Sequence, residues 1–191
     1  QACTDVVGLE ADKPQNRSND GRADPQGGFW IGTMGKGAQS WAGAIYRYYR
    51  GELRQLFDRI TISNSICFAP SGDRASFTDT RGRRIMPVPL DAQGWPVGAP
   101  ELYLDLRADE LNPDGSVVDA EGCLWNAQWG AHRVARYDAS GAFLEAVEFP
   151  AAQISCPAFG GDDLKTLFAT SAADGLDGPS EGQTFAIRLD V

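Results

Sequence analysis

The chain has 191 residues, with 17 Lys and Arg against 26 Asp and Glu, so its formal net charge is −9. This acidic balance argues against a nucleic-acid scaffold, which carries a basic footprint, and against electrostatic attachment to an anionic membrane. Hydrophobic residues make up 42% and charged residues 23%, as in an ordinary globular domain, and no apolar run approaches the roughly 20 residues of a membrane helix. We therefore expect one soluble domain.

The cysteines Cys3, Cys67, Cys123 and Cys156 are widely spaced and form no C-x-x-C pair. Their spacing argues against a structural zinc site and against the disulfide framework of a small secreted domain. The N-terminal QACTDVVGLEAD lacks the basic and apolar regions of a secretion signal. We expect free, mostly buried thiols and a cytoplasmic protein.

Four segments share one pattern: a turn containing Gly or Asp, then an aromatic residue, then a small or hydroxyl residue. The segments are DPQGGFWIGTMG (24–35), APSGDRASFTDT (69–80), DAEGCLWNAQWG (119–130) and FGGDDLKTLFATS (159–171). Their aromatic residues, 47, 48 and 43 residues apart, are Trp30, Phe77, Trp125 and Phe168. A repeat of this length predicts one structural unit per copy.

Strand-like runs rich in β-branched and aromatic residues follow each segment. In chain order they are 43–49 and 52–57, 83–91 and 101–106, 132–138 and 143–149, and finally 183–190. Together with a short run before each aromatic segment, they make about four strands per ~45 residues, which is typical of a β-propeller blade.

We predict an all-β fold, a β-propeller of four-stranded blades, with units at about 15–57, 60–106, 110–150 and 153–191. Helical periodicity is weak throughout the chain. A β-sandwich is the alternative, but a sandwich has no reason to repeat at this spacing. Because four units fill the chain, we expect either a small four-bladed ring or part of a larger one.

Polar residues share one position ahead of the aromatic segments. Asn19, Asn64 and Asp114 each lie eight residues before a turn glycine, and the corresponding position in the fourth unit is Ser155. Since the innermost strand of each blade lines the central channel, side chains at one register converge on the axis. Amide and carboxylate oxygens suit Ca²⁺, Mg²⁺ or Mn²⁺, so the pattern predicts a metal site. Taken singly, each residue is also a common turn former.

Four stretches at these residues resemble the SMP-30/gluconolactonase/regucalcin-like family. They are NRSNDGRADPQGGFWIGTMG (16–35), ITISNSICFAPSGDRASFTDT (60–80), NPDGSVVDAEGCLWNAQWG (112–130) and CPAFGGDDLKTLFATSA (156–172). Members of this family are six-bladed propellers that hydrolyse sugar lactones with a divalent cation in the central channel. The resemblance implies that this chain corresponds to the C-terminal two thirds of such a protein, with about four of the six blades.

The resemblance also implies roles for individual residues. Asn64 and Asp114 match metal ligands of the family, and Arg17 and Asn19 match its substrate-binding groups. The implied cofactor is one divalent ion, Ca, Zn, Mn, Mg or Fe. The implied partner is a small sugar lactone, with neither nucleic acid nor membrane involved.

Three features of the sequence depart from the family pattern. A further family ligand, a Glu in a G-E-G-P-like segment, has no counterpart. Gly37 stands where some relatives place a substrate-contacting Glu, and Ser65 stands where Gly usually follows the Asn. We expect activity to be impaired if the N-terminal blades are absent.

The activity that we expect is metal-dependent hydrolysis of a sugar aldonolactone to its acid, with Asp114 as the candidate general base. The alternative is a non-catalytic calcium- or metal-binding propeller, or an interaction platform. A G-x-S-x-G pattern at 178–182 resembles a nucleophile elbow, but a strand follows it and the only histidine, His132, precedes it. We expect the acidic pairs Asp162/Asp163 and Asp174/Asp177 to lie in solvated turns.

Overall fold

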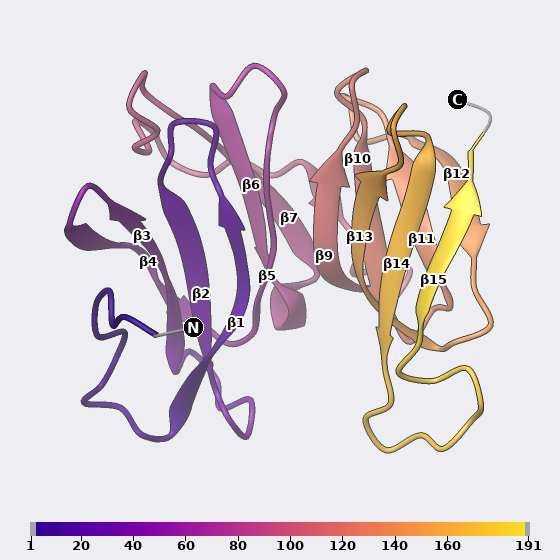
Figure 1. Cartoon of the computed structure of the whole chain (residues 1–191), viewed down its shortest axis with the longest axis horizontal. Helices are drawn as coiled ribbons and strands as arrows, with labels where there is room; N and C mark the ends of the chain where they lie inside the picture. The colour runs from indigo at the N-terminus through magenta and orange to yellow at the C-terminus, as the bar shows by residue number, and fades with distance from the viewer. Residues whose placement is uncertain (1–2, 190–191) are drawn as a thin grey trace.

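The computed structural model describes residues 3–189, whose strands form four antiparallel sheets (Figure 1). Sheet 1 contains β1 (Asn16–Ala23), β2 (Phe29–Gly35), β3 (Gly43–Tyr49) and β4 (Glu52–Ile60). Sheet 2 contains β5 (Ser63–Phe68), β6 (Arg74–Asp79), β7 (Arg84–Pro89) and β8 (Leu104–Asp105). Sheet 3 contains β9 (Asn112–Val118), β10 (Leu124–Trp129), β11 (Arg133–Tyr137) and β12 (Phe143–Glu148). Sheet 4 contains β13 (Gln153–Gly160), β14 (Thr166–Ala172) and β15 (Thr184–Arg188).

Within each sheet the strands follow one another in chain order, as in a propeller blade. Figure 1 shows the first strands of the sheets, β1, β5, β9 and β13, next to one another in the middle of the molecule, where successive ones are in contact. The predicted all-β propeller is confirmed, with three four-stranded sheets and one three-stranded sheet. In the part of the chain that the structure describes, no helix is long and apolar enough to cross a membrane.

Apolar side chains fill the three spaces between successive sheets. Trp30 is fully buried between sheets 1 and 2, and Trp125 between sheets 3 and 4, as expected for core residues. The middle space, between sheets 2 and 3, is filled by Cys67, Ile85, Leu104, Leu106, Leu124, Ala135 and Tyr137. Burial of these faces stacks the sheets and thereby brings their inner strands together.

The aromatic residues of the four repeats do not occupy one equivalent position. In sheet 2 the position equivalent to Trp125 holds Ala75, and Phe77 lies two residues further along the strand. In sheet 4 Phe168 is 39% exposed, while its neighbour Leu167 fills the core. Residues two apart share one face of a strand and adjacent residues take opposite faces, so Phe77 stays in the core beside Ala75, whereas Phe168 points out of it.

The outer strand of sheet 2 is shorter than predicted. A strand was expected over 101–106, but only Leu104–Asp105 is regular. Its neighbour β7 contains Pro87 and Pro89, which have no N–H to donate to the ladder. Outside these two residues, the segment is joined to β7 by isolated backbone hydrogen bonds, such as that from the Glu101 N–H to the Pro87 carbonyl at 2.9 Å.

Candidate functional site

Each inner strand is irregular at the position predicted to face the axis. The pairing register shifts between Ser18 and Gly21 in β1, between Asn64 and Cys67 in β5, and between Ile154 and Cys156 in β13. In β9 the shift lies opposite Asn126 and Gln128 of β10. Because a β-bulge breaks the alternation of a strand and re-aims side chains, these four irregularities turn polar groups toward the axis.

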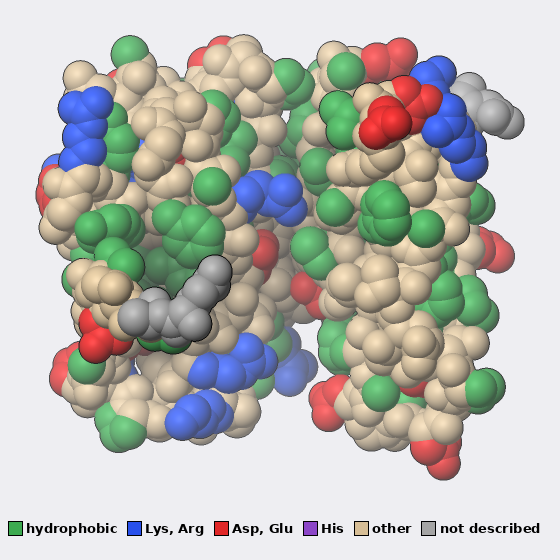
Figure 2. Space-filling view, in the orientation of Figure 1, with side chains coloured by type: hydrophobic (Ala, Val, Ile, Leu, Met, Phe, Trp, Pro, Cys, Tyr) green, Lys and Arg blue, Asp and Glu red, His purple; other side chains and the backbone are tan. Residues whose placement is uncertain are grey.

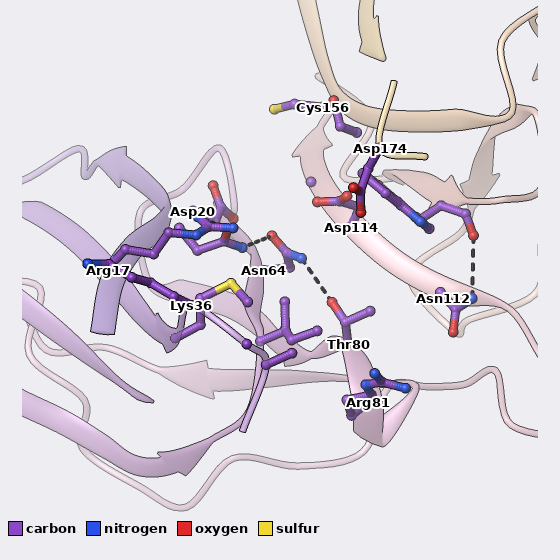
Figure 3. Close-up of a pocket in the computed structure, with 18 residues that line it drawn as sticks. Arg17, Asp20, Lys36, Asn64, Thr80, Arg81, Asn112, Asp114, Cys156 and Asp174 are labelled. Carbon is purple, nitrogen blue, oxygen red and sulfur yellow. Dashed lines mark hydrogen bonds between the residues drawn. The ribbon is translucent and has the colours of Figure 1, made fainter. Parts of the chain in front are cut away.

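The polar groups line one pocket of about 630 Å³. Its walls include Arg17, Asn19, Asn64, Asp114 and Ser155, so the structure brings together every site residue that the sequence predicted (Figure 3). Figure 2 shows the molecule hollowed between the half that contains sheets 1 and 2 and the half that contains sheets 3 and 4. The convergence of these residues is therefore observed, while their chemical roles remain predictions.

A chain of hydrogen bonds runs along the sheet 1 and sheet 2 side of the pocket. Arg17 Nη1 donates to Asn19 Oδ1 (2.8 Å), and Asn19 Nδ2 donates to Asn64 Oδ1 (3.1 Å). Asn64 Nδ2 donates to Thr80 Oγ1 (2.9 Å), which donates to the Pro113 carbonyl (2.7 Å). Arginine can only donate and a carbonyl can only accept, so the two ends of the chain fix the orientation of both amides.

Ser65 holds the backbone of Asp114 in place. The Ser65 hydroxyl donates to the Asp114 carbonyl at 2.5 Å. Ser65 has a φ of 56°, in the left-handed region that favours glycine, which accounts for the Gly usual at this position. Serine is strained there, but it supplies a hydrogen bond between β5 and β9 that glycine lacks.

The protein does little to stabilise the charged form of the Asp114 carboxylate. Burial and the nearby Asp20 carboxylate together raise its pKa to about 8, and a hydrogen bond from the Gly115 N–H offsets them only in part. A carboxylate in such surroundings gains from a ligand that supplies positive charge or hydrogen-bond donors.

Asp20 is a second pocket carboxylate, which the sequence analysis did not select. Its Oδ2 accepts the Ile66 N–H at 2.7 Å, and Arg22 Nε donates to the Ile66 carbonyl at 2.9 Å, so both side chains attach β1 to β5. Burial raises the pKa of Asp20, while the Ile66 N–H and Arg22 act in the opposite direction. Consecutive residues of a regular strand face opposite sides, so only the bulge lets Asp20 share the pocket with Asn19.

Other lining residues also came from the structure alone, among them Lys36, Thr80, Arg81, Trp129 and Cys156.

Asp174 lies in an exposed turn, as the sequence predicted. This turn, in the loop between β14 and β15, also lines the pocket, which the sequence analysis did not predict. Two hydrogen bonds of 2.9 Å between its backbone and the Gln153 side chain hold the loop there.

The donor set fits a hard divalent cation. The Asn64 amide oxygen and the carboxylates of Asp20 and Asp114 belong to the same pocket. Oxygen donors of this kind, completed by water, suit Ca²⁺, Mg²⁺ or Mn²⁺ better than soft thiophilic metals.

A second acidic group lies at the turn after β9, where the ligand atoms of Asp119, Glu121 and Cys123 are within 4.8 Å of one another. Arg136 already occupies this group: its Nε donates to Asp119 (3.0 Å) and its Nη2 to Glu121 (2.6 Å). Because a guanidinium supplies the positive charge there, the axial pocket is the better candidate for a metal.

The competing motifs do not assemble an active site. Residues 178–182 lie in a loop that leads into β15 without a helix, and His132 is exposed. All four cysteines are free: Cys67 and Cys123 are buried, Cys156 is partly buried and Cys3 is exposed. The expectation of free thiols is confirmed. The expectation that most of them are buried holds for two of the four, Cys67 and Cys123.

Comparison with known proteins gives a consistent result. Residues 1–173 match the protein-family model described as SMP-30/Gluconolactonase/LRE-like region. A relative from Rhizobium meliloti (strain 1021), named as a candidate sugar lactone lactonase, is 44% identical over 187 residues, covering 94% of this chain and 64% of its own. The L-arabinolactonase of Azospirillum brasilense is 36% identical over 198 residues, covering 98% and 64%.

Among solved structures, a calcium-binding protein described as regucalcin, from Agrobacterium tumefaciens strain C58, matches with a TM-score of 0.91. It is 47% identical, and the match covers 94% of this chain and 63% of that one. The chain thus spans slightly less than two thirds of the length of the relatives that it matches.

Proposed function

The chain belongs to the SMP-30/gluconolactonase/LRE-like family, and from this membership we infer that it hydrolyses a sugar lactone to its acid in the axial pocket, using one divalent cation. The observation that carries the proposal is the convergence of Asn64 and Asp114, from neighbouring sheets, on the pocket that also contains Arg17 and Asn19. The relatives named as lactonases support the reaction class.

Asn64 and Asp114 would hold the cation, with Asp20 adding negative charge nearby. A bound divalent cation supplies Lewis-acid polarisation of the lactone carbonyl and lowers the pKa of a water molecule. Asn64 is prepared for this role, because Thr80 and Asn19 hold its amide in one orientation.

Asp114 is the group that we assign to proton transfer. Water adds to the carbonyl carbon, the bond between that carbon and the ring oxygen breaks, and the ring oxygen leaves as a hydroxyl. The Asp114 carboxylate accepts the proton of the water and returns it to the departing oxygen. Its position in the pocket and its small number of protein hydrogen bonds leave it available for this exchange.

Arg17 and Asn19 bind the sugar. Arg17 Nη1 donates to the Ser18 carbonyl and to Asn19 Oδ1, and the other N–H groups of its planar guanidinium are donors for hydroxyl or carboxylate oxygens of a ligand in the pocket. Its bond to Asn19 also orients the Asn19 amide, so Arg17 contributes to both binding and positioning.

The test is a pH-indicator assay of acid release from an aldonolactone, with added Mn²⁺ or Ca²⁺. We expect hydrolysis above the spontaneous rate with metal, none in excess chelator, and loss of hydrolysis in Asp114→Ala. Equal rates in Asp114→Ala and the parent protein, or full activity in chelator, would remove the mechanism.

A second candidate function is metal binding without catalysis, because the matched structure from A. tumefaciens is described as calcium-binding. Calorimetric titration with Ca²⁺ and Mn²⁺ separates the two: tight metal binding without lactone hydrolysis favours the binding function. We also propose a cytoplasmic location, because Cys3, Cys67, Cys123 and Cys156 are free thiols.

A further inference from the structure

A buried polar cluster lies beside the pocket without lining it. The cluster consists of Asn126 in β10, Ser65 in β5 and Ser116 in β9, all fully buried. Asn126 Nδ2 donates to Ser116 Oγ (3.0 Å) and to Ser65 Oγ (3.2 Å), and Ser116 Oγ donates to Ser65 Oγ (3.0 Å). Because an amide nitrogen can only donate, the hydrogen bonds run from Asn126 through the serines and end on the Asp114 carbonyl, which the Ser65 hydroxyl reaches.

The cluster holds the β-bulge that carries Asp114. In the pairing of β9 with β10, two residues, Asp114 and Gly115, lie opposite the single residue Ala127. Asn126 Nδ2 also lies 3.3 Å from the Gly115 carbonyl oxygen and 3.4 Å from that of Asp114, so the two N–H groups of the amide are shared among several acceptors. A bulge takes its residues out of the regular ladder, so the side chains of Asn126 and Ser65 supply hydrogen bonds to these carbonyl groups.

The bulge in turn directs the Asp114 carboxylate. Figure 3 shows this carboxylate in the pocket, and a bulge is the kind of irregularity that re-aims a side chain in this way. The backbone of Gly115 is also close to β13, because a Cβ on Gly115 would lie only 2.7 Å from the Ser155 carbonyl oxygen. Contacts with β5, β10 and β13 therefore fix the bulge, and with it the position of the Asp114 side chain.

The amide of Asn126 has a cost for the fold. Asn126 Oδ1 is buried and accepts no hydrogen bond from any residue that the structure describes, and a buried acceptor without a partner is destabilising. Asn126 points toward sheet 2, where it meets Ser65. On the faces of the corresponding strands that pack against the preceding sheet, β6 carries Phe77 and β14 carries Ala169, both in the apolar core. Stability alone therefore favours an apolar residue at this position, and a role of the amide in the site explains why the chain has Asn126.

We propose that Asn126 is a positioning residue, which works with Ser65 and Ser116 to hold the Asp114 carboxylate at the place where the cation and the attacking water are bound. The inference rests on the proposed lactonase function and deepens it by giving a role to a residue outside the pocket wall. The cluster bonds to the backbone of Asp114 and leaves its carboxylate oxygens without those donors. The position of the carboxylate is therefore fixed, while its oxygens stay available to a ligand.

The test replaces the amide by an apolar side chain of similar size, in Asn126→Leu. Calorimetric titration with Mn²⁺ and with Ca²⁺ should show a metal affinity lower by about ten- to hundredfold, as for other residues that orient a metal ligand. The kcat for lactone hydrolysis should fall by a similar factor. The KM should stay within about threefold of the parent value, because Arg17 and Asn19 bind the sugar from sheet 1.

Gln128→Met is the matched control. Gln128 is a second fully buried amide, two residues further along β10, but it bonds to β11: its Nε2 donates to the Tyr137 hydroxyl (2.8 Å), and its Oε1 accepts Arg133 Nε (2.6 Å). This variant should also lower the thermal stability, but it should keep the metal affinity and kcat within about twofold of the parent values. The inference is overturned if Asn126→Leu keeps the metal affinity and kcat of the parent, or if Gln128→Met loses as much of both as Asn126→Leu.

Ser65→Gly tests the cluster in a variant that should fold. Ser65 has a φ of 56°, so glycine relieves strain and the thermal stability should stay the same or rise. The metal affinity should nevertheless fall by about two- to fivefold, the worth of one neutral hydrogen bond, because the Asp114 carbonyl loses the Ser65 hydroxyl. A purely structural role would not lower the affinity without lowering the stability. Should Asn126→Leu fail to fold, the parent metal affinity in Ser65→Gly overturns the inference.

Hydrogen exchange in the metal-free protein separates this inference from the proposed function. The backbone N–H groups of residues 112–118 should exchange faster in Asn126→Leu than in the parent protein, while Gln128→Met should leave this segment unchanged. If the parent protein binds no cation and hydrolyses no lactone, the proposed function fails, and faster exchange at 112–118 still supports the role of Asn126 in holding the bulge. Unchanged exchange at 112–118 rejects that role whatever the catalytic result.

Discussion

Asp114 and Asp119 lie only five residues apart, one in the axial pocket and the other at the outer turn that follows β9, yet their surroundings are opposite. Asp119 Oδ1 accepts the N–H groups of Glu121 and Cys123 at 2.9 Å each, and its Oδ2 accepts Trp125 Nε1 at 2.9 Å. Burial acts to raise the pKa of Asp119, but these hydrogen bonds and Arg136 outweigh it and the pKa is lowered.

The pKa of Asp114, by contrast, is raised to about 8 by burial and by Asp20. The comparison distinguishes carboxylates that stabilise the fold from carboxylates that are available to bind a ligand. A carboxylate whose hydrogen bonds are supplied by the chain stabilises the fold, whereas one that the chain leaves short of partners is free to bind a ligand.

Sheet 1 repeats the structural arrangement of the outer turn. Arg47 lies opposite Trp30 in the strand pairing, as Arg136 lies opposite Trp125, and Arg47 Nε donates to Asp24 Oδ2 at 2.6 Å. The side chains of Arg47 and Asp24 are fully buried. The outer turns of sheets 1 and 3 thus share an aspartate, a tryptophan and an arginine, while the pocket side keeps its carboxylates unpaired.

The largest effect on stability is expected at the buried pair. Asp24→Asn keeps the shape of the side chain but leaves Arg47 buried without a counter-charge, so the free energy of unfolding should fall by about 3–5 kcal/mol. Chemical denaturation measures this. Asp73→Asn, at an exposed residue that accepts a bond from the Ser71 hydroxyl, is the control and should change stability by less than about 0.5 kcal/mol. An equal loss in both variants would contradict the structural role of the pair.

The pocket carboxylate should show the opposite behaviour. Asp114→Asn should lower kcat/KM for lactone hydrolysis by about a hundredfold or more, because a ligand of the metal and the proton acceptor are lost together. The free energy of unfolding should stay the same or increase, because a poorly paired charge is removed. A variant that loses stability and activity in parallel would make Asp114 a structural residue like Asp119.

Asp119→Asn sharpens the same comparison. It should lower the free energy of unfolding by about 1–3 kcal/mol, because Arg136 loses a charged partner and Trp125 a charged acceptor. The kcat/KM value of the folded protein should remain within about twofold of the parent value. Thermal unfolding and the lactone assay on one preparation test both halves of this expectation.

The smallest effect is the pH dependence of stability in chelator. The folded pKa of Asp114, about 8, lies above its unfolded value, so the native state holds an extra proton between about pH 4 and 8 and stability falls as pH rises through that window. Asp114→Asn should flatten this fall, because the amide that replaces the carboxyl group does not titrate in this range.

Asp119 acts in the acid range instead. Its folded pKa is lowered, so its contribution to stability is present above the unfolded pKa and is lost as pH falls through the folded value. Asp119→Asn should therefore lower the free energy of unfolding near neutral pH and make that free energy depend less on pH in the acid range. Denaturation curves at pH 3, 5, 7 and 9 distinguish the two residues, and a flat difference between the parent protein and Asp114→Asn would reject the assignment.

The sequence by itself determined the repeated unit, because turn glycines and alternating apolar residues act locally and recur in every blade. It also determined the ring of polar residues, since Asn19, Asn64 and Asp114 share one distance from a turn glycine. The position of each aromatic residue was predicted less well, as Phe168 shows, because adjacent residues of a strand take opposite faces.

Only the tertiary structure decided which further side chains join the pocket. Asp20 enters through a β-bulge, Arg81 through a short helix capped by Asp79, and Asp174 through a loop anchored to Gln153. None of these follows from residue spacing, because bulges and loops break the alternation on which a strand pattern depends. The tertiary structure also decided which carboxylates have partners within the protein. Asp114 and Asp119 are the same residue type on the same stretch of chain, and only the groups that surround them make Asp119 structural and leave Asp114 available for chemistry.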